Sequence, residues 1–336
     1  MAEKPMGARA KLFSKPEQLR ELGLLLFIIL IGLVVQLRNP GFLSITNITA
    51  LFTNTAILGI LAVGMMLVLV TRGIDLSIGA IIAFSGMTTA LTVARFPGMP
   101  PILAMAEGIL IGMVFGSLSG FLVAWMDVLP IIATLGMMNV VRGLTYVVSG
   151  GQWVSSYQMS AGFKGLATGK ILGINNLIVI AFAVFVLAAF FINHTRTGRR
   201  IYAVGSNPEA AGISGLPRRR LVFYAYLIMG GLAGLAGVLW VAKFASAQGN
   251  TAIGYELNVI AACILGGVSI AGGVGRIFGL VLGTVLFGIL NNALPLINVS
   301  PFWQMGIQGL VILAAVITNV LVRRNTERNA LRRRAI

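Results

Sequence analysis

Ten apolar runs make up most of this 336-residue chain and constrain its fold more than any other feature. They lie at about 22–37, 48–70, 78–94, 101–126, 131–148, 176–192, 221–242, 257–270, 277–297 and 302–322. A helix needs about 20 residues, at about 1.5 Å each, to cross a bilayer. The run at 257–270 is short and the run at 78–94 is marginal, so either could be broken or re-entrant. We therefore predict an all-α, polytopic integral membrane protein with about ten transmembrane helices.

Composition supports a membrane protein. The mean hydropathy is +0.94, and 57% of residues are hydrophobic against 10% that are charged, which is not a soluble composition. The net charge of +16 comes from loops and tails, where basic residues meet anionic lipid headgroups, so we do not expect nucleic-acid binding. The single cysteine, Cys263, excludes an intrachain disulfide and a cysteine metal cluster.

The distribution of Lys and Arg predicts the orientation. If the N-terminus is cytoplasmic, the inside segments hold 19 of the 25 basic residues, the outside segments hold five, and Arg142 lies within a span. Cytoplasmic loops are normally the positive ones. No small-x-small cleavage site follows the first apolar run, so we expect it to be an uncleaved span. The expected domains are a cytoplasmic N-terminal tail (1–21), a transmembrane domain (22–322) and a basic cytoplasmic tail (323–336).

The polar segment 193–220 interrupts the apolar runs near mid-chain and carries six of the basic residues. Its centre is predicted to be a short helix with Ser206 or Asn207 as N-cap, Pro208 in the first helical position, and Gly212 or Gly215 as the stop. We expect this segment to be cytoplasmic, and such a helix suits docking into a groove of a cytoplasmic partner.

The sequence contains no pattern for catalysis. The one histidine, His194, lies at the edge of a span, and no phosphate-binding loop or metal-ligand cluster is present. The stretch 272–276 (GGVGR) lies between two spans rather than after a strand, so we interpret it as a tight turn. We expect no enzymatic activity, cofactor or metal in this chain, and any ATP that drives it must be hydrolysed by another chain.

Polar residues within spans are costly and usually functional. Asp75 or Ser77 could cap the helix that follows, or Asp75 could serve as a gate or pathway residue. Arg142 needs an anionic partner, for which Glu107, Asp75 and Glu256 are candidates, or a wet cavity. The amides could line a polar path or bridge helices. The candidate pathway or gate residues are Asn54, Asp75, Asn139, Arg142, Asn291 and Asn292.

Glycines recur at four-residue spacing in three apolar runs. The clearest sets are Gly112, Gly116 and Gly120, and Gly230 with Gly234. Small residues at this spacing share one helix face and let helices approach closely in lipid, so we interpret these motifs as packing contacts before any role in gating.

Four motifs together resemble the permease subunits of bacterial monosaccharide ABC importers, the ribose, arabinose, rhamnose and autoinducer-2 group. They are GIDLSIG (73–79), ATLG (133–136) with Arg142-Gly143, AVGSNPEAAGISG (203–215), and AACILGGVSIAGGVGR (261–276) with Asn291-Asn292. The resemblance covers residues 40–322. The basic cluster Arg218-Arg219-Arg220 departs from it.

The resemblance implies an ABC importer permease fold (type II-like) in the bacterial inner membrane. It implies sugar delivery by a periplasmic binding protein, a second permease that is identical or homologous, and a separate ATPase that binds ATP and Mg. The segment around Glu209 would be the coupling helix for that ATPase. Its expected residues are Asn207, Pro208, Glu209, Ala210, Ala211, Gly212 and Gly215. An ion-coupled secondary transporter remains the alternative.

Overall fold

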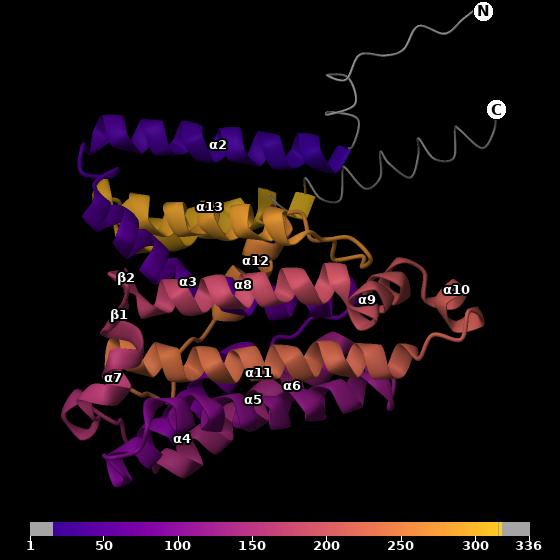
Figure 1. Cartoon of the computed structure of the whole chain (residues 1–336), viewed down its shortest axis with the longest axis horizontal. Coiled ribbons are helices and arrows are strands. Elements are labelled where there is room, and N and C mark those ends of the chain that lie inside the picture. The colour runs from indigo at the N-terminus through magenta and orange to yellow at the C-terminus, as the bar shows by residue number, and fades with distance from the viewer. Residues whose placement is uncertain (1–15, 315, 318–336) are drawn as a thin grey trace, which may run out of the picture.

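The structure is a computed structural model that describes residues 16–314 and 316–317. The first 15 residues of the predicted N-terminal tail, the end of the last apolar run and the tail at 323–336 lie outside the described residues. The described chain is almost entirely helical, and its long helices lie side by side in one bundle (Figure 1).

Eight helices are long and apolar enough to cross a membrane in the described part of the chain. They are α2 (Pro16–Arg38), α3 (Ile45–Val70), α4 (Ile78–Arg95), α5 (Pro101–Ala124), α6 (Pro130–Ser149), α8 (Asn176–His194), α11 (Arg218–Phe244) and α13 (Ile277–Leu296). The shorter elements are η1 (Ser156–Gln158), α7 (Ala161–Thr168), α9 (Arg196–Ser206), α10 (Pro208–Ile213), α12 (Tyr255–Leu265), a helix at Pro301–Ala314, and the antiparallel strands β1 (Lys170–Ile171) and β2 (Ile174–Asn175).

Eight of the ten predicted runs fall on these long helices, including the marginal run at 78–94, which forms the continuous helix α4. The run at 257–270 falls on α12, which has only 11 residues and would extend about 16 Å. The run at 302–322 is described only in part, over the helix Pro301–Ala314, so the count of ten spans stays a prediction. α3 is apolar all round and lies at the centre of the bundle with 89% of its span window buried, whereas α2 lies at the edge with 11% buried.

The glycine motifs join α5 to α11. A Cβ atom on Gly116 would lie 2.5 Å from the carbonyl oxygen of Tyr226, and one on Gly112 would overlap the backbone of Gly230. The two backbones are therefore in direct contact, which only glycine permits at this separation. The packing interpretation of these motifs is confirmed.

The two ends of the bundle differ in charge. α9 and α10 lie at one end, and α7 with the β1–β2 hairpin lies at the other (Figure 1). The α9–α10 end also holds Arg276, which pairs with Glu21 of α2 at 3.0 Å, and the arginines that begin α11. Lys164 and Lys170 lie at the opposite end, on α7 and β1. The bundle thus separates these basic residues as the charge count predicted.

Two irregular segments enter the bundle between helices. Residues 71–77 separate α3 from α4, and the Tyr226 hydroxyl donates to the Ile74 carbonyl at 3.2 Å. Residues 245–254 lead from α11 to α12. This second segment packs against the first turn of α4, where a Cβ atom on Gly79 would lie 2.5 Å from the Ala252 carbonyl oxygen. Non-helical backbone at membrane depth requires such burial within the protein.

The orientation can be tested by labelling. We expect single cysteines at Tyr157 and Ser206, in a Cys263→Ala background, to react with an impermeant maleimide from opposite sides of the membrane. Tyr157 is 88% exposed on η1, Ser206 is exposed at the end of α9, and the charge bias places Ser206 in the cytoplasm. Labelling of both positions from one side would contradict the predicted threading.

Candidate functional site

The candidate coupling segment is a pair of short helices, α9 and α10, with separate N-caps. The Thr195 hydroxyl accepts from the Gly198 amide at the start of α9. The Asn207 side chain accepts from the amides of Glu209 and Ala210 at the start of α10. Pro208 follows as the first helical residue. The predicted N-cap and first turn of α10 are therefore confirmed, with Asn207 as the capping residue.

The end of α10 also follows its sequence. The helix stops at Ile213, and Gly215 adopts a φ of +73°, a conformation that glycine reaches without strain. Of the two glycines predicted as stops, Gly215 has this role, while Gly212 lies within the helix.

α9 is fixed to two loops of the bundle. The Arg72 guanidinium donates to the carbonyls of Gly205 and Ser206, each at 2.7 Å. The Tyr202 hydroxyl donates to the Gly275 carbonyl at 2.8 Å, and burial raises the pKa of Tyr202, so this donor keeps its proton. These contacts hold α9 rigidly against the bundle.

The turn at 272–276 completes this attachment. The Gly273 amide donates to the Val70 carbonyl at 2.9 Å, and Gly272 and Gly273 both have positive φ angles. A Cβ atom on Gly273 would lie 2.5 Å from the Cα of Ser206. The tight-turn interpretation is confirmed. Gly272 and Gly273 are needed because the backbones of α9 and of the end of α3 lie too close to the turn to leave room for a side chain.

α10 extends beyond the bundle (Figure 1), but one of its expected coupling residues does not lie on its exposed face. Ala211 is only 5% exposed and packs into the core, so it is not available to a partner. Glu209, Ala210 and Gly212 are exposed, and Ile213 is 90% exposed. Ala211 is the small side chain that packs α10 against the bundle. Ile213 is therefore the exposed apolar side chain of α10 that a partner could contact.

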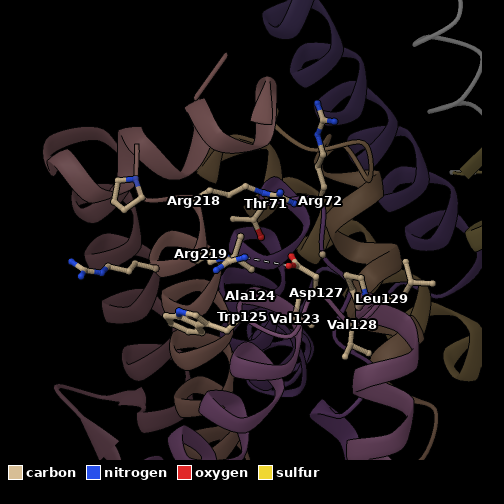
Figure 2. A pocket seen from close by; sticks show the side chains of 15 residues that line it. Thr71, Arg72, Val123, Ala124, Trp125, Asp127, Val128, Leu129, Arg218 and Arg219 are labelled. Carbon is tan, nitrogen blue, oxygen red and sulfur yellow. Dashed lines mark hydrogen bonds and ion pairs between the residues drawn. The ribbon is translucent and has the colours of Figure 1, made fainter. Parts of the chain in front are cut away.

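A pocket of about 700 Å³ lies at the base of this segment. Its walls come from three places: Thr71, Arg72 and Gly73, the α5–α6 connection, and the start of α11. Figure 2 shows Arg218 and Arg219 extending into it, with Arg219 and Asp127 joined at 3.4 Å. The pocket is basic, because Asp127 is the only carboxylate among its lining residues.

Asp75 lies in the irregular segment before α4 and is fully buried. One carboxylate oxygen accepts from the Ser77 amide at 2.9 Å and from its hydroxyl at 2.6 Å, and the other has no partner. The expected helix cap is wrong, because the Ser77 side chain makes no capping bond and Asp75 stabilises the turn that precedes the helix. A gating role remains a prediction.

Arg142 is bound by backbone oxygens. Its Nη1 atom donates to the carbonyls of Gly249 and Thr251, each at 2.8 Å. It makes no ion pair among the described residues, although the charge of Glu256 acts on it. Arg142 therefore attaches the irregular segment 245–254 to α6, which sequence alone could not identify because neither carbonyl is distinguishable by residue type.

We expect Arg142→Met to lower the free energy of unfolding by about 2 kcal/mol, because it leaves two part-buried carbonyls without their charged donor. The melting temperature of the detergent-purified chain measures this effect. Arg95→Met is the matched control, since Arg95 is exposed at the end of α4. Equal melting of the two variants would show that these bonds contribute nothing.

The amide candidates are not brought together. Asn292 exchanges two hydrogen bonds with Asn47 of α3, at 3.0 and 3.1 Å, and so bridges helices. Asn291 accepts from Gln308 at 2.7 Å. Asn54 and Asn139 are exposed on the outer faces of α3 and α6. No hydrogen bond joins any two of the six candidate pathway residues, all of which lie in the described part of the chain.

The fold and the site define a class of protein: a multi-pass membrane protein that presents an anchored helix pair at its basic end. Residues 47–316 match the family described as branched-chain amino acid transport system / permease component, and the chain belongs to this family. No solved structure matched the chain.

Relatives with assigned names cover nearly the whole chain. The ribose import permease protein RbsC of Escherichia coli strain K12 is 38% identical over 309 residues, or 91% of this chain and 95% of that protein. RbsC of Bacillus subtilis strain 168 is 40% identical over 89% of this chain and 92% of that protein. The L-arabinose ABC transporter permease protein AraH of Azospirillum brasilense is 35% identical over 91% of this chain and 89% of that protein. These relatives favour a permease of an ABC importer over an ion-coupled secondary transporter.

The sequence reasoning missed three residues that position the site. Arg72 was counted only as a basic loop residue, and Tyr202 and Ile213 were not singled out. The alternation of buried Ile201 and Val204 with exposed Arg200 on α9 could have indicated an amphipathic helix that packs on the bundle. Nothing in the sequence marks Arg72 as the residue that binds it.

Proposed function

We propose that this chain is the membrane-spanning permease of an ATP-driven importer that carries a monosaccharide, or a similar small polyol, into the bacterial cytoplasm. The observation that carries the proposal is the similarity over nearly the full chain to permeases named for ribose and arabinose. A permease named for D-allose is also 35% identical over 88% of the chain. We place the protein in the inner membrane, where it would receive sugar from a periplasmic binding protein.

A separate ATPase that holds ATP and Mg would supply the energy. Its contact would be the exposed face of α10, formed by Glu209, Ala210 and Ile213. Glu209 lies in the first turn, where its negative charge interacts favourably with the positive end of the helix dipole. A groove that takes the apolar Ile213 side chain would fix the helix in place.

A second permease would complete the importer. The outer face of α6 exposes Gly136, Asn139 and Gly143, and a Cβ atom on either glycine would meet nothing within 4 Å. An exposed amide is costly in lipid, and small residues beside it allow close approach of another helix. We propose this face as the contact with the second permease.

A movement of α10 would be transmitted to the membrane-spanning helices through α9 and Arg72. Arg72 binds the last turn of α9 and lies in the same irregular segment, residues 71–77, as Asp75. That segment is packed tightly, because a Cβ atom on Gly73 would lie 2.6 Å from the Tyr226 hydroxyl. If the ATPase displaces α9, residues 73–77 would therefore move with it, because this segment is too tightly packed to deform independently.

We expect Arg72→Gln to reduce sugar uptake about tenfold or more while the ATPase still co-purifies, because two charge-assisted bonds that link α9 to the segment are lost. Uptake and ATP hydrolysis are measured in the same proteoliposomes. Arg200→Gln, which removes an exposed α9 charge, is the control. Normal uptake by Arg72→Gln would contradict this route.

Reconstitution tests the proposed function. The chain, its co-purifying ATPase and a purified sugar-binding protein are placed in liposomes, and uptake of labelled ribose, arabinose and allose is followed. We expect uptake that needs both ATP and the binding protein and that persists when ion gradients are collapsed. Uptake by this chain alone, driven by an ion gradient, would establish the secondary transporter instead.

A further inference from the structure

We propose that the basic pocket at the base of α10 binds the phosphate-bearing headgroup of an anionic phospholipid. We define the basic pocket as the 700 Å³ cavity between the α5–α6 connection, residues 71–73 and the start of α11. A volume of this size is in the range of small-ligand sites. This assignment does not depend on the transported solute.

The positive charge of the pocket is not balanced by the protein. Arg218, Arg219 and Arg220 form the first turn of α11 and line the pocket. Asp127 pairs only with Arg219, and the two side chains are 67% and 61% exposed, so the pair is weak. Neither Arg218 nor Arg220 makes an ion pair among the described residues. Arg72 also lines the pocket and binds only neutral carbonyls, so four arginines and one aspartate leave three net positive charges.

The helix start adds to this imbalance. α11 has 27 residues, no acidic residue in its first turn and no side-chain cap at Pro217. Cations at a helix N-terminus face the positive end of the helix dipole, which is the unfavourable arrangement. An anion in the pocket would interact favourably with the guanidinium groups and with the positive end of the helix dipole.

An apolar surface adjoins the charges. Trp125 lines the pocket, is 37% exposed, and stacks on Phe121 with ring centroids 5.8 Å apart. Met126 and Leu129 in the same connection are 58% and 66% exposed. Tryptophan is enriched at the membrane interface. Figure 2 shows Trp125 on one side of the arginines and Leu129 on the other.

This combination identifies the occupant. A lipid headgroup would bind the arginines while its acyl chains cover the apolar side chains beside them. Free phosphate or an acidic peptide of a partner would bind only the arginines of the basic pocket. Either ligand would leave Leu129 and Met126 exposed. Basic pockets at the ends of transmembrane helices are suited to such headgroups.

Native mass spectrometry of the detergent-purified full chain tests the proposal, with phosphatidylglycerol and phosphatidylcholine of the same acyl chains as ligands. We expect phosphatidylglycerol to bind at least about tenfold more tightly, and the triple variant R218Q/R219Q/R220Q to lose that preference, because basic side chains attract anionic headgroups. The triple variant R196Q/R199Q/R200Q removes the same charge outside the pocket and should keep the preference.

Two further measurements separate the alternatives. R218K/R219K/R220K keeps the charge and should retain the preference, and melting temperatures show that each variant is folded. Displacement of the lipid by millimolar inorganic phosphate would assign the pocket to free phosphate and overturn the proposal. Unchanged lipid binding by the glutamine triple, with loss of the co-purifying ATPase, would overturn it in favour of a protein contact.

Discussion

Replacing Gly112 with leucine should abolish the folded permease. A Cβ atom at this position would overlap the Gly230 carbonyl and would lie 2.7 Å from the Gly234 amide nitrogen. These neighbours are backbone atoms that cannot rotate away, so α5 and α11 would have to separate along their whole contact. We expect no monodisperse peak in size-exclusion chromatography. Gly112→Ala adds the same Cβ atom against the same backbone atoms and should also destabilise the fold, but by less than leucine, because the two helices would have to separate by a smaller distance.

Gly23→Leu is the matched control for this prediction. Gly23 lies on an exposed face of α2, and a Cβ atom there would meet nothing within 4 Å. It adds the same side chain to another apolar helix and should leave the chromatographic profile and the melting temperature unchanged. A monodisperse Gly112→Leu protein that melts like the parent would show that the two helices do not pack as described.

Ile213→Asp should separate the permease from its ATPase. Ile213 is 90% exposed on α10, so the change removes no internal contact and should not affect insertion or melting. Burying the introduced carboxylate in a groove that accepts isoleucine would be unfavourable without a partner. We expect co-purification of the ATPase and ATP-dependent uptake to fall at least about tenfold, which corresponds to about 1.4 kcal/mol of contact energy.

Leu172→Asp is the control, because Leu172 is 98% exposed in the β1–β2 turn at the opposite end of the bundle. The ATPase should still co-purify with this variant. Ala211→Arg is not a comparable test, because Ala211 is buried and an arginine there would displace α10 itself. Full ATPase recovery with Ile213→Asp would show that α10 does not form the contact.

Much of the architecture could be predicted from local sequence. Apolar runs determine which segments are helices, because only a helix satisfies its own backbone in lipid. The start of α10 was predictable because a cap acts within three residues of Asn207. The α5–α11 contact was partly predictable, since glycines spaced by four share a face, although the sequence could not specify which helices would pair.

The roles of single polar residues were decided only by the tertiary structure. Arg142 bonds to carbonyls more than 100 residues away, and a carbonyl carries no residue-specific signal. Asn292 became a helix bridge because Asn47 happens to face it.

The sequence by itself determined the membrane class, the helical segments and the capped helix of the central loop, because hydropathy and capping act over a few neighbouring residues. The tertiary structure decided that Ala211 faces inward, that Arg72 holds α9, and that the three arginines of α11 line one pocket. These outcomes depend on which distant backbones come into contact, and no local pattern encodes that.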